Sequence, residues 1–163
     1  EIMSSDWSSD VCSSDPAAMP EEEQRQTFEY YEKRNTFASS LSASTSCVVG
    51  LRLGLQEHAY NYFKLAARLD LDNLHFDQNT NEGIHAACTG GACMCAFLGY
   101  GGIDVRDGLL YIHPILPEQW SSMLVRFRFR GRSIRVVADA DGVRVHVTGA
   151  PLDLQTDGHV VYD

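Results

Sequence analysis

The four residues Gly99-Tyr100-Gly101-Gly102 divide the chain into two parts with different hydrophobic patterns. Before them, apolar side chains recur every three or four residues, which is typical of helices packed on one side. After them, apolar and polar residues alternate, which is typical of strands with one buried face and one face in water. The chain has 163 residues, enough for one ordinary domain or two small ones. We therefore predict a helical domain over residues 19–100 and a small antiparallel β domain over residues 101–163.

Four helices are predicted in the first part of the chain. Glu21–Glu23 place carboxylates in the first turn of the first helix, where they complement the helix dipole, and Gly54 is expected to end the second helix. The fourth helix is apolar on nearly every side, so it is expected to be buried all round. The third carries one apolar stripe made of Ala59, Tyr62, Phe63, Ala66 and Leu69. The predicted helices begin near residue 21 and near 40 or 42, and then cover 56–69 and 84–98.

The second part is expected to form a small antiparallel sheet or sandwich. Gly131-Arg132 and Asp141-Gly142 are signals for hairpin turns. Arg126, Arg128 and Arg130 alternate with apolar residues and form a basic stripe on one strand, which is either a solvated face or a binding site. A solvated face is the simpler interpretation, because the stripe is a single strand in an acidic chain. The predicted strands cover 109–113, 124–130, 134–138, 143–148 and a tail ending at 160–162.

Composition excludes several classes of protein. The formal net charge is −9, which argues against a nucleic-acid or acidic-membrane binder, since such proteins need a basic face. No apolar run approaches the roughly 20 residues that span a bilayer, and no secretory signal is recognised. We therefore expect a cytoplasmic protein with no nucleic-acid or membrane partner. The five cysteines lack the spacing of a zinc site, so buried free thiols and no metal are expected.

Residues 1–18 are expected to lie outside the fold. The triplet Ser-Ser-Asp occurs three times between Ser4 and Asp15, and the stretch around it has almost no apolar periodicity. Residues 6–15 look like a translated sequencing adapter joined to a truncated gene, and such segments are excluded from reasoning about the fold. A natural disordered acidic tail is the alternative. In either case the segment cannot bury enough apolar surface to offset the entropy lost on ordering.

The stretch from Asn79 to Gly91 is the candidate ligand site. Its polar start can cap a helix, and Glu82 would complement the dipole of the first turn. Ile84, Ala87 and Cys88 are expected to share an inward face. His85 would then lie near a helix N-terminus, where free N–H groups favour an anion. The alternative is a capped core helix with an incidental histidine.

Several motifs in a fixed order, from about Pro20 to the end, resemble the late part of glycoside hydrolase family 65, which includes the maltose, trehalose, kojibiose and nigerose phosphorylases. The motifs are Phe28-Glu29-Tyr30-Tyr31-Glu32, Ser39-Ser40-Leu41-Ser42, Arg68-Leu69-Asp70-Leu71-Asp72-Asn73, Asn79–Ala87 with Gly90-Gly91, Gly99–Val105, His113–Trp120 and Phe127–Arg132. The resemblance implies that the helices close an (α/α)6 catalytic barrel and that the strands form the C-terminal domain. It also implies that the chain is a C-terminal fragment of a longer enzyme.

The resemblance further implies an inverting α-glucoside phosphorylase that uses inorganic phosphate to release β-glucose 1-phosphate. Ser39, Ser40 and His85 match positions that contact phosphate in the family, although the serines are equally able to cap a helix and His85 to make only a structural hydrogen bond. Phosphate is then a co-substrate, no cofactor is implied, and the substrate is an α-linked glucose disaccharide. Relatives are often homodimers.

Some parts of the family pattern are absent from the chain. The general acid belongs to an upstream barrel segment, so this chain contains no catalytic acid and should be inactive alone. Phe37 stands where relatives commonly have histidine. Two alternatives remain open: a trehalase-like hydrolase of the same family, and a non-catalytic carbohydrate-binding module in which Trp120 and Tyr111 stack on sugars. The linkage and the acceptor sugar are set by contacts outside this sequence.

Overall fold

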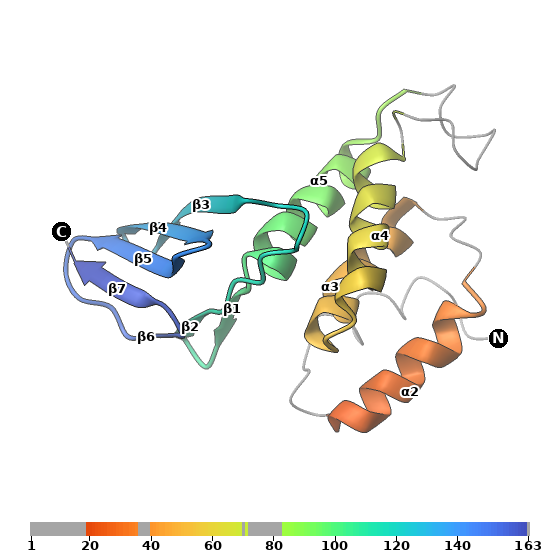
Figure 1. The fold of residues 1–163 in the computed structure, drawn as a ribbon, viewed down its shortest axis with the longest axis horizontal. Helices are drawn as coiled ribbons and strands as arrows, with labels where there is room; N and C mark the ends of the chain where they lie inside the picture. Colours follow the sequence, from red (N-terminus) through yellow and green to blue (C-terminus); the bar gives the residue numbers. More distant parts are fainter. Residues whose placement is uncertain (1–18, 36–39, 70, 72–82, 163) are drawn as a thin grey trace. The chain divides into compact units, whose positions relative to one another are not determined.

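The computed structural model describes residues 19–35, 40–69, 71 and 83–162. The chain divides into two compact units, the first ending at Ala92 and the second beginning at Cys93. The first unit is helical, and the second contains the strands (Figure 1). This order of helices followed by strands confirms the coarse fold prediction. The domain limits at residues 18/19 and 100/101 stay predictions.

Two antiparallel helices, α3 (Ser40–Arg52) and α4 (Gln56–Arg68), form the centre of the helical unit (Figure 1). Gly54 ends α3 as predicted, with a positive φ of 72°. Its N–H donates to the carbonyl of Leu51, and the next N–H, of Leu55, donates to the carbonyl of Gly50. These two bonds satisfy carbonyl groups that a helix end leaves free, and only glycine adopts this conformation without a steric cost.

The apolar stripe predicted on α4 packs against α3. Ala59 and Ala66 are buried, and the other members of the stripe are partly buried. The facing side of α3 buries Ala43, Cys47 and Leu51, which are spaced one turn apart. Small residues allow the close approach, because a Cβ placed on Gly50 would lie 3.4 Å from the Cβ of Ala59.

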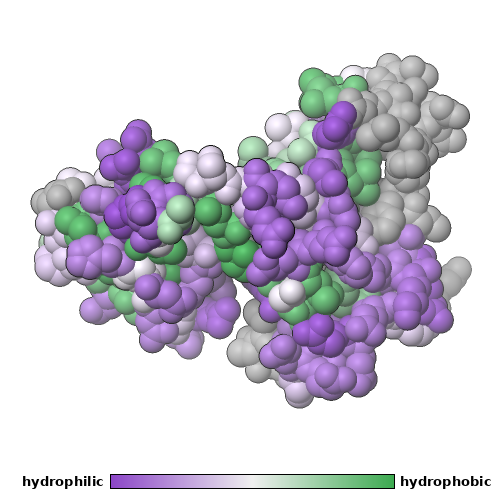
Figure 2. Space-filling view, in the orientation of Figure 1, coloured by the Kyte–Doolittle hydropathy of each residue, from purple (hydrophilic) through white to green (hydrophobic). Residues whose placement is uncertain are grey.

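The helix α2 (Glu21–Glu32) buries none of its residues. Its first turn is acidic, as predicted, and Figure 2 shows the visible side of this helix to be mostly hydrophilic. Polar contacts hold it in place: Arg25 donates from Nη2 to the carbonyl of Leu53 at 2.8 Å, and Tyr62 donates to Glu32 at 2.7 Å. Therefore α2 is attached to the α3–α4 pair by hydrogen bonds more than by apolar burial.

The helix α5 (Ala86–Met94) differs from its prediction. Cys88 is buried as expected, but Ile84 is 69% exposed and Ala87 is exposed, so the predicted shared inward face is wrong. For Ile84 the reason is that the helix begins at Ala86, and a residue that precedes the helix does not follow helical periodicity. Ala87 lies inside the helix, on its exposed side. The expectation of all-round burial is also wrong within the described residues, since α5 buries only Cys88 and Gly91.

A π-helical segment, η2 (Cys95–Tyr100), precedes the strands of the β unit. The N–H of Gly101 donates to the carbonyl of Ala96, five residues earlier, which widens the last turn. Gly102 follows with a φ of 58°, and a Cβ there would collide with the carbonyl of His113. The N–H of His113 donates to the carbonyl of Gly102 at 3.0 Å, so the glycines allow this close backbone contact.

The β unit contains two sheets with the strand orders β1-β2-β6 and β3-β4-β5-β7. Their inner faces share one core of Ile, Leu and Val side chains from both sheets. Most neighbouring strands are antiparallel, as predicted, but β2 pairs with β6 and β5 pairs with β7 in parallel, so the antiparallel prediction is wrong for these two pairs. The strands are β1 (Ile103–Arg106), β2 (Leu109–Ile112), β3 (Ser122–Phe129), β4 (Arg132–Asp139), β5 (Gly142–Thr148), β6 (Leu154–Thr156) and β7 (His159–Tyr162).

Hairpin turns lie one residue from their predicted positions. Arg130 and Gly131 form the loop between β3 and β4 with φ values of 47° and 78°, while Arg132 already pairs with Phe129. Two consecutive positive φ values match the turn type whose twist suits a two-residue hairpin. The strands β1 and β6 were not predicted. A second turn with two consecutive positive φ values, Asp107-Gly108, joins β1 to β2.

Candidate functional site

His85 lies immediately before α5 and takes the place of its N-cap. Its carbonyl accepts hydrogen bonds from the N–H of Cys88 at 3.0 Å and of Thr89 at 3.2 Å, and these bonds start the helix. The residue is partly buried. An imidazole at this place is next to the first N–H groups of a helix, which carry partial positive charge. The predicted location of His85 near a helix N-terminus is therefore confirmed.

The two serines of the predicted phosphate site are less completely described. Ser40 is the first residue of α3, and its side chain lies outside what the structure describes. Ser39, Phe37 and the polar stretch 79–82, including Glu82, lie outside the described residues. The grouping of Ser39, Ser40 and His85 around one phosphate stays a prediction.

The helices that carry Ser40 and His85 contact each other directly. A Cβ on Gly91 of α5 would lie 2.6 Å from Oγ and 2.9 Å from Cβ of Ser44 on α3. Figure 1 shows that α3 and α5 run in the same general direction, opposite to α4. Ser40 precedes Ser44 by one turn, and His85 precedes Gly91 by less than two turns. At a rise of about 1.5 Å per residue, both helix starts lie toward the same end of the α3–α5 contact.

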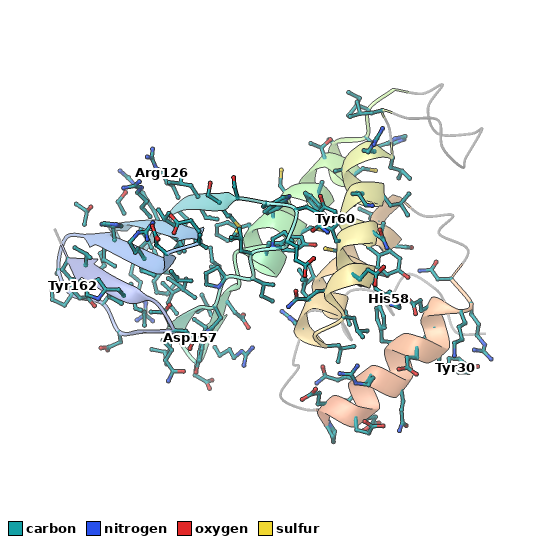
Figure 3. The ribbon with its side chains drawn as sticks, in the orientation of Figure 1. Tyr30, His58, Tyr60, Arg126, Asp157 and Tyr162 are labelled. Carbon is teal, nitrogen blue, oxygen red and sulfur yellow. The ribbon has the colours of Figure 1, made fainter. Side chains whose placement is uncertain are left out.

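A polar cluster of Glu32, His58 and Tyr62 joins α2 to α4, and sequence reasoning missed it. Oε1 of Glu32 accepts the Tyr62 hydroxyl at 2.7 Å and lies 3.5 Å from Nδ1 of His58 (Figure 3 labels His58). Burial, and then the neighbouring Glu32 carboxylate, raise the pKa of the Tyr62 phenol above its ordinary value. The Glu32 side chain is only 23% exposed. No local sequence pattern links residues so far apart in the chain.

The aromatic residues considered for sugar stacking differ in their surroundings. Trp120 packs against Tyr100 with ring centroids 4.9 Å apart, so it is part of the packing within the β unit. Tyr111 has the Arg106 guanidinium 5.2 Å from its ring centroid, and Arg106 is held by Asp104 at 2.8 Å. The Tyr111 ring is therefore already engaged by a cation.

Metal-binding clusters and membrane-spanning helices are absent from the part of the chain that the structure describes. Within the described ranges, no group of three or more His, Cys, Asp or Glu residues is arranged to hold a metal ion. The described helices include none that is long and apolar enough to cross a bilayer. Four cysteines in the described residues are free thiols, and Cys47, Cys88 and Cys95 are buried as expected, whereas Cys93 is exposed.

Comparison with known proteins gives the family. Residues 14–94 match the central catalytic domain of glycosyl hydrolase family 65, and residues 103–162 match the C-terminal domain of the same family. The α,α-trehalose phosphorylase of Geobacillus stearothermophilus is 37% identical over 123 residues, which are 76% of this chain and 16% of that protein. The kojibiose phosphorylase of Caldanaerobacter subterraneus subsp. tengcongensis is 39% identical over 132 residues, or 80% of this chain and 17% of that protein.

A solved structure agrees with these sequence matches. It is that of a candidate kojibiose phosphorylase from the human microbiome, with a TM-score of 0.77 and 30% identity. The alignment covers 86% of this chain and 19% of that one. The chain thus spans about a sixth of the length of the curated relatives that it matches. Its helices and strands correspond in order to the central catalytic and C-terminal domains of one family, and the chain belongs to glycosyl hydrolase family 65.

Proposed function

We propose that the protein of which this chain forms part is an inverting disaccharide phosphorylase. It would transfer glucose from an α-linked disaccharide to inorganic phosphate and so release β-glucose 1-phosphate. The observation that carries the proposal is the similarity to trehalose and kojibiose phosphorylases, which runs through both the helical and the β part of the chain. Its helices would then be the closing part of an (α/α)6 barrel.

The proposed reaction is a single displacement. An oxygen of phosphate attacks the anomeric carbon while a carboxylic acid protonates the departing glycosidic oxygen, so the configuration inverts. The acid would come from a part of the barrel outside this sequence. Within this chain the task is to hold phosphate, and we assign it to Ser39, Ser40 and His85.

The position of His85 suits a phosphate ligand. A dianion is stabilised by hydrogen-bond donors and by positive potential, and the start of α5 offers both the imidazole and the partial charge of the helix terminus. Ser40 stands at the start of α3 on the same side of the α3–α5 contact, so its backbone N–H and hydroxyl would add further donors. A serine there can cap α3 and contact phosphate at once.

The same positions argue against hydrolysis. A hydrolase needs a carboxylate base to activate water where the phosphorylase binds phosphate. No carboxylate replaces Ser39, Ser40 or His85 in this sequence. Within the described residues Glu32 accepts a hydrogen bond from Tyr62 on α4, which supports a structural task for that carboxylate.

Phosphate dependence of the full-length protein tests the proposal. Kojibiose, trehalose and maltose are offered separately with and without inorganic phosphate, and glucose 1-phosphate and free glucose are quantified. We expect glucose 1-phosphate of β configuration from at least one disaccharide, and no cleavage without phosphate. Phosphate-independent release of free glucose would instead show a hydrolase. The 163-residue chain alone is expected to be inactive on all three sugars.

Four further properties are proposed together with this activity. The enzyme is cytoplasmic and needs no cofactor besides phosphate as co-substrate. It forms a homodimer, which light scattering on the full-length protein would detect. Residues 1–18 contribute nothing to the fold, so deletion of that segment should leave the unfolding transition of the chain unchanged.

A further inference from the structure

The outer face of the four-stranded sheet is more basic than the sequence indicated. Arg126 and Arg128 are exposed on β3, as the alternating pattern predicts, and Figure 3 labels Arg126 on this strand. The sequence places these arginines on one strand, which favours a solvated face. The register of the sheet changes this interpretation, because it adds basic side chains from two further strands.

Cross-strand pairing extends the arginine stripe into a basic row. Arg126 lies directly opposite Arg135 of β4, and Arg135 lies directly opposite His146 of β5. Directly opposed residues point to the same side of a sheet, with Cβ atoms about 4.5–5.5 Å apart. Arg128 continues the basic surface along β3, and Arg144 continues it along β5. We call the surface made by Arg126, Arg128, Arg135, Arg144 and His146 the basic face.

Few carboxylates neutralise the positive charge of the basic face. Asp139 on β4 is hydrogen-bonded to Arg144, whose guanidinium lowers the pKa of that carboxyl. The ion pairs of the described residues include no carboxylate partner for Arg126, Arg128 or Arg135. Like charges directly opposite each other destabilise a sheet, so the Arg126–Arg135 pair costs stability unless an anionic partner neutralises it.

An apolar pair lies beside these arginines. Leu124 lies opposite Val137, and this pair is the neighbour of the Arg126–Arg135 pair on the same face of the sheet. Leu124 is 50% exposed. Protein interfaces combine exposed apolar side chains with arginine, which is enriched there relative to lysine. From residue 101 to its end, the chain contains seven arginines and no lysine.

We propose that the basic face is a docking surface for an acidic protein segment whose carboxylates pair with Arg126, Arg128 and Arg135 and whose apolar residues cover Leu124. Charge complementarity selects the partner, since the face is cationic within a chain of net charge −9. Nucleic acid fits less well, because the outward positions named on this face offer no Phe, Tyr or Trp ring for stacking on bases. The surface is independent of the proposed catalytic function.

Binding of a defined acidic peptide to the 163-residue chain tests this proposal. The probe is a fluorescein-labelled peptide of repeated Glu-Glu-Leu units, and its anisotropy is followed at low and at high ionic strength. A single-stranded oligonucleotide of equal charge is the competing probe. The variants are Arg126→Glu and Arg135→Glu. Lys64→Glu on α4 is the matched control, since it makes the same charge change at an exposed site outside the face.

The expected result is saturable peptide binding that weakens as salt rises. Each arginine reversal should weaken binding by about tenfold, because it replaces an attraction with a repulsion, whereas Lys64→Glu should bind within about twofold of the unchanged chain. Arg126→Lys should retain most of the binding, and circular dichroism verifies that each variant is folded. The proposal is overturned if the unchanged chain does not bind the peptide, if Arg126→Glu binds as well as the control, or if the oligonucleotide binds more tightly than the peptide.

Discussion

At the scale of single residues, His85 is the position where the proposed function makes the sharpest prediction. His85→Ala in the full-length protein removes the imidazole that the proposed function assigns to phosphate binding, and it leaves the α5 backbone, whose first bonds use the His85 carbonyl, unchanged. A hydrogen bond to a charged group contributes about 1.5–3 kcal/mol, so the KM for phosphate should rise by about 10- to 100-fold. Initial rates at varied phosphate and saturating disaccharide provide the measurement.

A neighbouring substitution controls this experiment. Ile84 is 69% exposed and lies beside His85, so Ile84→Ala alters the same segment without removing a polar group. Its KM for phosphate should stay near that of the unchanged enzyme. If both variants raise this KM equally, the effect comes from disturbance of the segment, and the phosphate contact assigned to His85 is wrong.

Tyr62 offers a test of how α2 is attached. Tyr62→Phe removes the hydroxyl that donates to Glu32. The Glu32 carboxylate, which is partly buried, then lacks that donor. Such a loss costs about 1–3 kcal/mol of unfolding free energy, which urea unfolding of the chain measures. Tyr60→Phe, on the same helix, removes a hydroxyl away from Glu32 and should change the unfolding free energy much less. Equal effects of the two substitutions would rule out the Glu32 bond as the cause.

The raised pKa of Tyr62 predicts a pH dependence with a definite sign. In the unfolded chain the phenol loses its proton near its ordinary pKa of about 10, whereas in the folded chain it keeps the proton to higher pH. The contribution of the Tyr62 phenol to folding stability is therefore complete below pH of about 10, and it is lost as the pH rises through the pKa of the folded state. The unfolding free energy of the unchanged chain should fall more steeply above pH of about 10 than that of Tyr62→Phe. Parallel pH profiles would contradict this linkage.

Residue patterns in the sequence identified some of these features and not others. The location of His85 near a helix start follows from a polar stretch before an apolar run, although the helix begins at Ala86, after the predicted capping residues Asn79 to Asn81. The exposure of Ile84 does not, because periodicity applies only inside the helix, and the helix begins two residues later. The Glu32–Tyr62 bond could not be predicted, since it depends on how two helices pack. The Asp107-Gly108 turn carries a recognisable Asp-Gly hairpin signal, although it was not among the predicted turns.

At the scale of elements, substitution of two adjacent glycines tests the packing of α5 and its intrinsic helix preference separately. Gly91→Ala places a Cβ 2.6 Å from Oγ of Ser44, so α3 and α5 must move apart, and a cost of about 1–3 kcal/mol is expected. A Cβ on Gly90 would meet no packing neighbour within 4 Å, so Gly90→Ala should stabilise α5 by up to about 1 kcal/mol. Thermal unfolding of both variants gives the comparison. Destabilisation by both substitutions would contradict the α3–α5 contact.

The element order was predictable because each helix or strand carries its own periodicity. Alternation identified β3 and β5, and the capping glycine identified the end of α3. Strand direction was not predictable in the same way. The parallel pairs β2–β6 and β5–β7 join strands that are distant along the chain, and no local pattern encodes which edge a late strand joins. The basic face depends on the same information, since register alone brings Arg135 opposite Arg126.

At the scale of the whole molecule, the β unit has a core of its own. Every buried residue of its hydrophobic cluster lies between Ile103 and Leu152, so this core needs no side chain from the helical unit. A domain of this size is marginal, and each additional contact is therefore important for its stability. Phe97 of η2 packs edge-to-face on Phe127 at 5.4 Å, and Tyr100 is buried beside Trp120.

These contacts predict a difference between two shortened polypeptides. Residues 93–163 should fold cooperatively, with a near-ultraviolet circular dichroism signal from Trp120 and one thermal transition. Residues 103–163 keep the buried cluster but lose Phe97 and Tyr100, and large aromatic residues removed from a packed site cost about 3–5 kcal/mol each. In a domain whose total stability is of that order, such a loss should leave the shorter polypeptide largely unfolded at room temperature. Equal stability of the two would show that η2 is only a connection, and failure of the longer one to fold would show that the β unit requires the helices.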